Sequence, residues 1–314
     1  MFHSSKQRNM LFKSESDIQE IRNKVNQNFR DSNQECSEFF ISPEDERLLC
    51  RKFERELLRF CNVFEEPPLF RSIKCTAMNF LKRFYLKHSA MEFYPQNVML
   101  LCVYFACKVD EYTIGIDKFV SMLEESLQFE TGSFILGNEF LLMEALDYSL
   151  TVYNSYRPLD GFLIELEHKL SKESADCLKS HALSFINDAI LTDATLIYSP
   201  SQIALSSLVY SSEQNKVEIG GYIKSLTPDT VTHNKLIATV TKIRQHLQLN
   251  YKFQISSSKL KELEAKCGAI SKSLEIDGDE GSSADERQQQ QQQQGERISK
   301  RRKTLEEMET ELLS

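Results

Sequence analysis

The sequence predicts an all-α protein, and three observations support this fold class. The chain of 314 residues contains only 10 Gly and 7 Pro, and the first glycine is Gly115. Average proteins contain about 7% Gly and 5% Pro, and β-hairpins and dinucleotide-binding folds depend on turn glycines. Apolar residues also recur at helical spacing in one segment after another. Hydrophobic residues make up 41% of the chain, and 20 Phe and 11 Tyr supply bulk for a sizeable core.

The N-terminal segment, residues 1–41, is predicted to carry one amphipathic helix. Ser14 stands three residues before Asp17, which is the spacing of a capping box. One apolar face follows, formed by Ile18, Ile21, Val25 and Phe29. Because the other faces are polar, we expect this helix to lie against a larger body. Residues 31–38 are expected to form a loop.

Residues 42–152 are predicted to form a module of five helices. Ser42 and Pro43 give an N-cap followed by proline at the first helical position, and Pro67-Pro68 ends that helix. The run Val98 to Cys107 is apolar on every side, which indicates a central helix wrapped by others. The remaining helices are expected over about 71–87, 117–123 and 133–146.

The pattern then recurs at an offset of 105 residues. Ala77-Met-Asn-Phe80-Leu81 matches Ala182-Leu-Ser-Phe185-Ile186 without a gap, and Pro95 matches Pro200. We therefore predict a second module over residues 153–250, and the alternative is a chance match between two apolar helices. Its helices are expected over 160–170, 172–191, 201–211, 218–226 and 231–249.

The C-terminal part is predicted to be a helix followed by a disordered tail. Residues 251–275 contain an amphipathic pattern from Ser257 to Leu274. Residues 276–314 are polar and include a polyglutamine run, so they cannot bury enough apolar surface to order themselves. Two short patterns lie in this tail. The first is a basic cluster, which is interpreted as a nuclear localisation signal or, alternatively, as a solvated charge run; it consists of Lys300, Arg301, Arg302 and Lys303. The second is Thr304, which directly follows this cluster and fits an acid-directed phosphorylation site.

Charge and cysteine placement restrict the class of protein. A formal net charge of −8 argues against a general nucleic-acid binder, which carries a strong basic excess. The eight cysteines show no Cys-x-x-Cys pattern and no zinc spacing, so we expect free thiols in a reducing compartment. The first twelve residues are too polar for a signal peptide, and the longest apolar run is about half a membrane span. We therefore expect a soluble intracellular protein.

Catalytic and metal-binding motifs are missing from the sequence. Gly132 and Gly137 have the spacing of a phosphate loop, but Asn138 and Glu139 stand where Lys and Ser or Thr are required. The sequence has no zinc-protease, serine-hydrolase or kinase catalytic pattern. We expect no catalytic residues, no cofactor and no metal, although a site assembled only by folding stays open as an alternative.

One charged cluster follows the apolar run. Lys108, Asp110 and Glu111 come directly after Cys107, and Glu139 opens the segment Phe140-Leu141-Leu142-Met143. The plain interpretation is a cation near one helix C-terminus and an acid in the early turns of another helix. In the functional alternative, Lys108 and Glu139 mark the rim of a docking surface, where they meet each other and a partner's backbone.

These features together resemble the cyclin family over about residues 1–270. The run Leu101-Cys-Val-Tyr-Phe-Ala-Cys-Lys108-Val-Asp-Glu111 resembles the third helix of a first cyclin box, and Glu139 stands nine residues before Tyr148 in the fifth. Cyclins carry a functional Lys and Glu at these two places. Further resemblance lies in Lys82-Arg83-Phe84-Tyr85-Leu86, Tyr156-Arg157-Pro158 and Tyr198-Ser199-Pro200-Ser201-Gln202.

The resemblance implies a non-catalytic, nuclear kinase regulator made of two cyclin boxes. It is strongest to the cyclin of the CDK-activating kinase, which also forms the kinase module of transcription factor IIH and phosphorylates RNA polymerase II. The implied partners are a cyclin-dependent kinase, a RING-finger assembly factor and the core of that transcription factor. The resemblance assigns kinase binding to Lys108 and Glu139, with Asp110 and Glu111 beside them.

Two alternatives to this kinase regulator stay open. One is another transcriptional cyclin of the C, K or T type, and co-purification with the RING-finger factor would distinguish it. The other is a DNA-binding initiation factor with the cyclin fold, which needs a basic surface and an affinity that falls steeply with salt.

The internal repeat predicts where the kinase-binding surface lies. The offset of 105 residues puts Glu213 opposite Lys108 and Arg244 opposite Glu139. The second module therefore lacks the Lys/Glu pair in that order, and we expect the kinase-binding surface to belong mainly to the first module.

Overall fold

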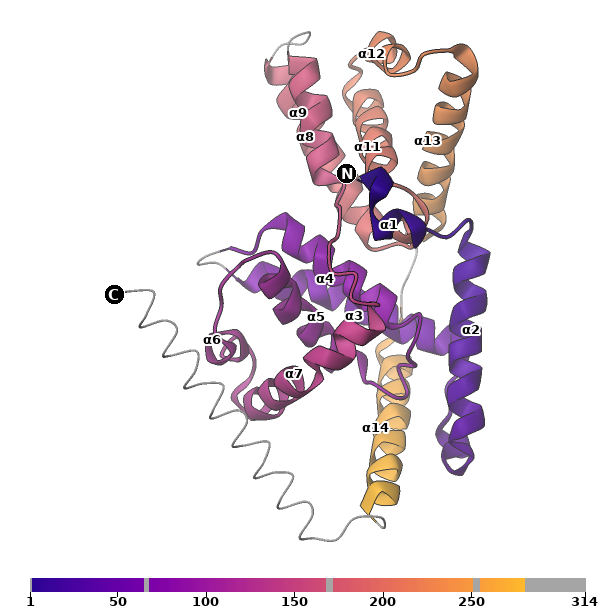
Figure 1. The fold of residues 1–314 in the computed structure, drawn as a ribbon, viewed down its shortest axis with the longest axis vertical. Helices are drawn as coiled ribbons and strands as arrows, with labels where there is room; N and C mark the ends of the chain where they lie inside the picture. The colour runs from indigo at the N-terminus through magenta and orange to yellow at the C-terminus, as the bar shows by residue number, and fades with distance from the viewer. Residues whose placement is uncertain (1, 65–67, 168–171, 251–254, 280–314) are drawn as a thin grey trace, which may run out of the picture. The chain divides into compact units, whose positions relative to one another are not determined.

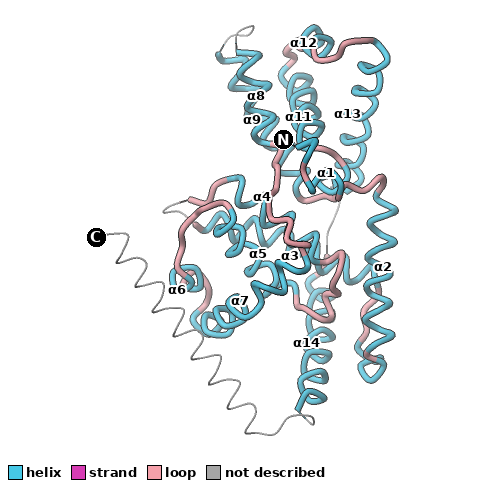
Figure 2. The backbone as a smooth tube through the Cα atoms, in the orientation of Figure 1, coloured by secondary structure: helices cyan, strands magenta, loops and turns pink. Residues whose placement is uncertain are grey.

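The computed structural model of this chain describes residues 2–64, 68–167, 172–250 and 255–279 as helices joined by loops (Figures 1 and 2). The predicted all-α fold with two tandem modules is confirmed. Contacts divide the chain into a unit formed by residues 1–267 and a second unit from residue 268 onward, which includes the last turns of the final helix. The first unit holds both modules.

The N-terminal segment folds into short turns followed by one long helix. Its elements are η1 (Phe2–Ser4), α1 (Lys6–Asn9), α2 (Glu15–Ser32) and η2 (Gln34–Phe39). The predicted capping box is confirmed, because the Asp17 N–H donates to Ser14 Oγ (3.2 Å) and the Ser14 N–H donates to Asp17 Oδ2 (3.0 Å). The loop predicted for residues 31–38 is wrong in part, because η2 folds there around the buried Cys36.

The first module consists of five helices around one central helix. They are α3 (Pro43–Val63), α4 (Arg71–Phe84), α5 (Pro95–Val109), α6 (Ile116–Val120) and α7 (Glu125–Ala145). The predicted N-cap is confirmed, because the Asp45 N–H donates to Ser42 Oγ at 3.1 Å. Every residue from Val98 to Cys107 is buried, and α5 packs against α3, α4 and α7. The apolar run is therefore the core of this module.

The helix α7 begins eight residues before the predicted start at Ser133. Two signals of a helix start are missing, because Glu124 makes no side-chain cap hydrogen bond and Gly132 interrupts the pattern. Gly132 instead lies within the length of α7, on the side that faces α6. A Cβ added there would lie 3.7 Å from a Val120 side-chain atom. The sequence pattern therefore concealed two turns of this helix.

The second module repeats the first. Its helices are α8 (Tyr156–Glu167), α9 (Lys172–Ile190), α10 (Ala194–Ile197), α11 (Pro200–Asn215), α12 (Gly220–Ser225) and α13 (Thr230–Asn250). When α7 is shifted by 105 residues, it covers residues 230–250, which are the bounds of α13. The central helix α11 packs against α8, α9 and α13, as α5 packs in the first module. The predicted repeat is confirmed, and the short α10 is an addition that the sequence pattern did not reveal.

The last helix, α14 (Ser257–Asp279), starts as predicted and extends past the expected end at Leu274. Its first turns lie against the first module, because Lys259 Nζ is 3.2 Å from Asp45 Oδ2 in the first turn of α3. Leu263 and Cys267 are buried. The tail was predicted for residues 276–314, but residues 276–279 belong to α14, and residues 280–314 lie outside the described residues.

A buried charged cluster joins the N-terminal helix to both modules. We call it the Asp193 cluster, and it consists of Arg22, Arg47, Glu54, Lys82 and Asp193. Asp193 receives two hydrogen bonds from Arg22 of α2 (2.7 and 2.9 Å) and two from Arg47 of α3 (3.2 and 3.4 Å). Lys82 of α4 donates to the carbonyl oxygens of Ile190 (2.5 Å) and Thr192 at the end of α9.

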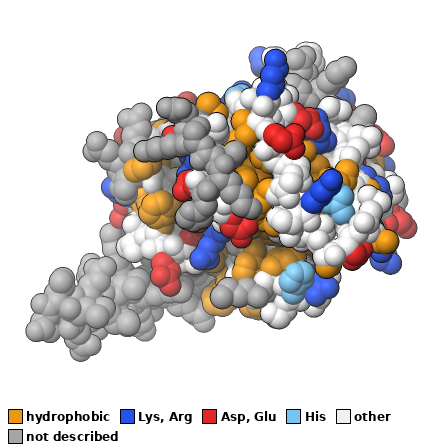
Figure 3. Space-filling model, turned by 90° about the horizontal axis from the view of Figure 1, so that it is seen from above, with side chains coloured by type: hydrophobic (Ala, Val, Ile, Leu, Met, Phe, Trp, Pro, Cys, Tyr) orange, Lys and Arg blue, Asp and Glu red, His pale blue; other side chains and the backbone are white. Residues whose placement is uncertain are grey.

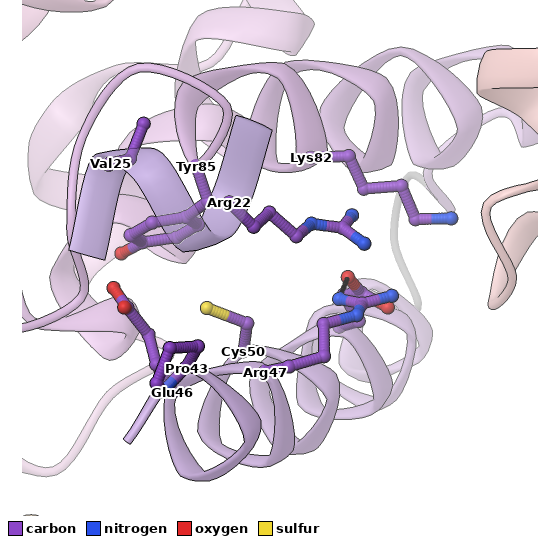
Figure 4. Close-up of a pocket in the computed structure, with 9 residues that line it drawn as sticks. Arg22, Val25, Pro43, Glu46, Arg47, Cys50, Lys82 and Tyr85 are labelled. Carbon is purple, nitrogen blue, oxygen red and sulfur yellow. Dashed lines mark hydrogen bonds and ion pairs between the residues drawn. The ribbon is translucent and has the colours of Figure 1, made fainter. Parts of the chain in front are cut away.

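Four members of the Asp193 cluster line one end of a small cavity of about 20 Å³ (Figure 4), namely Arg22, Arg47, Glu54 and Lys82. Figure 4 shows the side chains of Arg22, Arg47 and Lys82 extending toward the same end of this cavity. Glu46 lies at the other end, where its carboxylate accepts hydrogen bonds from Asn26 (2.6 Å) and Ser89 (2.7 Å). Polar side chains from α2, α3 and α4 therefore meet inside the molecule rather than at its surface.

Electrostatics determines the protonation of this cluster. Burial acts to raise the pKa of Asp193, but the guanidinium groups of Arg47 and Arg22 outweigh burial and hold that pKa well below its usual range. Burial lowers the pKa of Lys82 to about 8, although Glu54 and Asp193 act in the opposite direction. The carboxylate of Asp193 therefore stays charged at neutral pH, while Lys82, with a pKa of about 8, titrates just above neutral pH.

Removing the central carboxylate tests the importance of this cluster for stability. The substitution Asp193→Asn leaves two guanidinium groups without their shared anion, and loss of one member of a buried ion pair costs about 3–5 kcal/mol. We expect that decrease in the free energy of unfolding, measured by urea titration at neutral pH. The control is Asp160→Asn, whose partner Lys179 lies 3.6 Å away at the surface, and this change should cost less than about 0.5 kcal/mol. Equal effects of the two substitutions would contradict the assigned role.

The pKa of Lys82 predicts a pH dependence of stability. Between the folded pKa of about 8 and the ordinary value of 10.5, the unfolded chain holds a proton that the folded chain has released. Stability contributed by Lys82 therefore rises with pH in this window, by about 1.4 kcal/mol for each pH unit. We expect the difference in unfolding free energy between wild type and Lys82→Met to grow from pH 8 to 9.5, because the subtraction cancels the titration of buried thiols and tyrosines. A difference that stays constant would show that the folded pKa is not lowered.

Candidate docking surface

Lys108 and Glu139 meet at the surface of the first module, which is the arrangement that the functional alternative expects. Lys108 lies in the last turn of α5, and its Nζ donates to Glu139 Oε1 on α7. The Lys108 side chain is 43% exposed, whereas that of Glu139 is 10% exposed. Lys108 Nζ also lies 4.8 Å from the centre of the Tyr104 ring, which adds a cation–π contact. The pair therefore has a fixed position and presents its cation to solvent.

The interpretation that each charge complements the dipole of its own helix holds for Lys108 but not for Glu139. Lys108 stands at a helix C-terminus, where a cation complements the helix dipole. Glu139 was expected in the early turns of its helix, but α7 begins at Glu125, so Glu139 lies deep inside the helix. The dipole of α7 therefore does not account for Glu139, whereas its ion pair with Lys108 does.

Asp110 and Glu111 end the helix α5. Asp110 accepts a hydrogen bond from Thr76 Oγ1 at 3.3 Å, and Glu111 adopts a left-handed conformation with φ of 57°. The N–H of Tyr112 donates to Cys107 O (2.8 Å) and the N–H of Glu111 to Lys108 O (3.3 Å), which is a Schellman motif. The structure thus gives both acids a role in terminating α5, and their role in partner binding stays a prediction.

An exposed apolar stripe runs along α7 beside Glu139. The exposed fractions are 85% for Phe129, 37% for Leu136 and 68% for Phe140. Spacings of seven and four residues place these three side chains on one face of the helix. Ile135 and Leu142 of the same helix are buried, so α7 carries apolar residues on both faces. We call Lys108, Glu139 and this stripe the docking surface.

Sequence reasoning missed the three stripe residues. Phe129, Leu136 and Phe140 look like core residues in a helix that is apolar on two faces, because composition alone does not distinguish the buried face. A helix on the outside of a module needs only one apolar stripe, which faces the core. The segment has more apolar residues than one stripe requires, and this excess could have indicated an exposed apolar face. Contiguous exposed apolar residues commonly mark interaction sites.

The described residues hold no other candidate chemistry. No group of three or more His, Cys, Asp or Glu side chains among them could hold a metal ion, and none of their helices is long and apolar enough to cross a membrane. The eight cysteines are reduced thiols, and burial raises the pKa of several, that of Cys75 to about 12. Lys300, Arg301, Arg302, Lys303 and Thr304 lie outside the described residues.

Comparisons with solved structures find the same fold. A chain of the CAK complex from Chaetomium thermophilum bound to ATP-gamma-S has a TM-score of 0.73 and 22% identity, covering 90% of this chain and 95% of that one. A chain of the yeast TFIIK (Kin28/Ccl1/Tfb3) complex has a TM-score of 0.64 and 22% identity, covering 78% of this chain and 99% of that one. These identities establish similarity of fold alone.

Sequence comparisons establish the family. The family model of the cyclin N-terminal domain matches residues 20–151, and that of the cyclin C-terminal domain matches residues 154–248. Cyclin-H of Xenopus laevis is 36% identical over 233 residues, which cover 71% of this chain and 72% of that protein. The two modules are therefore cyclin boxes, and the chain belongs to the cyclin family.

Proposed function

We propose that this chain is the non-catalytic subunit that binds and activates a cyclin-dependent kinase of the CDK-activating type. The observation that supports this proposal is the Lys108–Glu139 pair beside an exposed apolar stripe, at the place where cyclins carry a functional Lys and Glu. The similarity to Cyclin-H of Xenopus laevis favours this member of the cyclin family. The similar folds come from complexes described as CAK and TFIIK.

The geometry of the pair suits recognition of a partner's backbone. An ammonium group has three N–H donors, and Glu139 takes one from Lys108, whose side chain is 43% exposed. The remaining donors are available to carbonyl oxygens of the kinase beside its αC helix. Phe129 and Phe140 supply apolar area next to these polar contacts, and interfaces combine an apolar core with a polar rim in this way.

Activation follows from selective binding to one kinase conformation. A protein kinase is active when the ion pair between its β3 lysine and its αC glutamate is assembled. A subunit that binds the assembled state more tightly shifts the equilibrium toward it by the difference in affinity. The chain itself would then need no catalytic residue, cofactor or metal.

The proposal extends to substrates, partners and location. The complex would phosphorylate the activation loop of other cyclin-dependent kinases and, within transcription factor IIH, the C-terminal repeats of RNA polymerase II. A RING-finger factor would assemble it, and its place of action would be the nucleus. Copurification of that factor, with kinase assays on both substrates, would distinguish this chain from a transcriptional cyclin of another type.

A DNA-binding role has little support. The net charge is −8, and the face drawn in Figure 3 carries Lys and Arg side chains interspersed with Asp and Glu. DNA-binding surfaces instead cluster positive charge on one face. A shift of duplex DNA by the purified chain in an electrophoretic mobility assay at low salt would favour this alternative.

Breaking the pair should weaken kinase binding without unfolding the chain. In the complex the pair is desolvated, and truncating one partner of such a pair costs about 2–5 kcal/mol, a loss of about 30-fold or more in affinity. We expect this for Lys108→Ala and Glu139→Ala, measured by calorimetric titration with the purified catalytic subunit. The matched control is Arg244→Ala, which breaks the corresponding pair of the second module. Wild-type affinity in both first-module variants would overturn the proposal.

The apolar stripe gives an independent prediction. Phe140 is 68% exposed in the free chain, so Phe140→Ser should change the melting temperature little. Removing an aromatic anchor from an interface costs about 2 kcal/mol or more, so kinase affinity should fall about 30-fold. Ile164→Ser in the second module, where Ile164 is 58% exposed, serves as the control. If Phe140→Ser and Ile164→Ser bound the kinase equally well, the stripe would not be part of the interface.

A further inference from the structure

The second module contains a charge-reversed copy of the Lys108–Glu139 pair. Arg244 Nη1 of α13 lies 2.8 Å from Glu213 Oε1 of α11, and the two side chains are 30% and 49% exposed. Glu213 occupies the position of Lys108 and Arg244 that of Glu139 when the chain is shifted by 105 residues. The second module thus keeps the bridge between its two helices but exchanges the signs.

Backbone geometry fixes this correspondence. The helix α11 ends on left-handed Lys216 (φ 54°), which lies 105 residues after left-handed Glu111 (φ 57°). The N–H of Lys216 donates to Glu213 O at 3.3 Å, and the N–H of Glu111 donates to Lys108 O at the same distance. Because α7 and α13 also have matching bounds, the two charged pairs sit on equivalent backbones.

The apolar stripe has no counterpart in the second module. The positions equivalent to Phe129, Leu136 and Phe140 hold polar residues, all of them exposed: Asn234, Thr241 and Gln245. The chain therefore presents two equivalent helix pairs. One has an apolar stripe and a cation on its central helix, and the other has polar residues at the three equivalent positions and an anion on its central helix. A partner that recognised only the backbone shape would bind both helix pairs, whereas one that recognised the side chains would distinguish them.

We infer that the order of the two charges, cation on the central helix and anion on the fifth, determines which module the kinase binds. This inference rests on the proposed function. Groups of the kinase that accept hydrogen bonds from Lys108 would face the carboxylate of Glu213 on the second module. Specific interfaces use such like-charge contacts to reject a wrong surface. The reversed pair thus excludes the kinase from the second module while still bridging its helices.

The test compares reversal of the first pair with its removal. The variant Lys108→Glu/Glu139→Arg copies the second module, where an equivalent helix pair accommodates the reversed bridge. The reference is Lys108→Ala/Glu139→Ala, and both are titrated with the purified kinase catalytic subunit. We expect the reversed variant to bind about tenfold or more weakly than the reference. This gap should shrink as salt is raised from about 50 to 500 mM, because screening weakens repulsion between charges.

Equal affinity of the reversed and alanine variants would overturn the inference, and so would a gap that is independent of salt. Neither result would contradict the proposed function, which fails only if removal of the Lys108–Glu139 pair leaves the affinity for the kinase at the wild-type value. A milder pair of variants serves if the reversed chain does not fold. Lys108→Glu/Glu139→Gln should bind about tenfold more weakly than the neutral Lys108→Gln/Glu139→Gln, and equal binding of these two would contradict the inference.

Discussion

The structure depends on one buried carboxylate, that of Asp193, held between guanidinium groups from two different helices. Arg22 of α2 and Arg47 of α3 converge on it, and Lys82 of α4 donates to carbonyls at the end of α9 just before it. Buried ionic groups are costly unless every partner is in place. The contacts of Arg22, Arg47 and Lys82 with Asp193 and the end of α9 therefore connect the N-terminal helix with both cyclin boxes.

The docking surface is built on the helices that this geometry holds. The central helix α5 packs against α3 and α4, which carry Arg47 and Lys82, and it holds Lys108 in its last turn. The helix α7 packs on α5 and carries Glu139 together with the exposed Phe129 and Phe140. Exposed aromatic side chains bring no stability to the free chain, so their place beside a half-exposed ion pair is explained by a partner rather than by folding.

The sequence predicted the features that local chemistry and repetition control. The capping box at Ser14, the proline at Pro43 and the all-apolar run to Cys107 identified three helices, and the offset of 105 residues identified the second box. The Asp193 cluster could not be predicted, because it unites residues up to 171 positions apart. Phe129 and Phe140 were hidden for another reason: exposed and core aromatic residues look alike in a helix that is apolar on two faces.

The central claim is that a kinase engages only the first box, and hydrogen exchange tests it most directly. Amide exchange of the full chain is measured by mass spectrometry with and without the purified kinase catalytic subunit. The account predicts slower exchange at the end of α5, from Ala106 to Tyr112, and along α7, with α11 and α13 unchanged. Slower exchange in α11 and α13, with α5 and α7 unchanged, would contradict it.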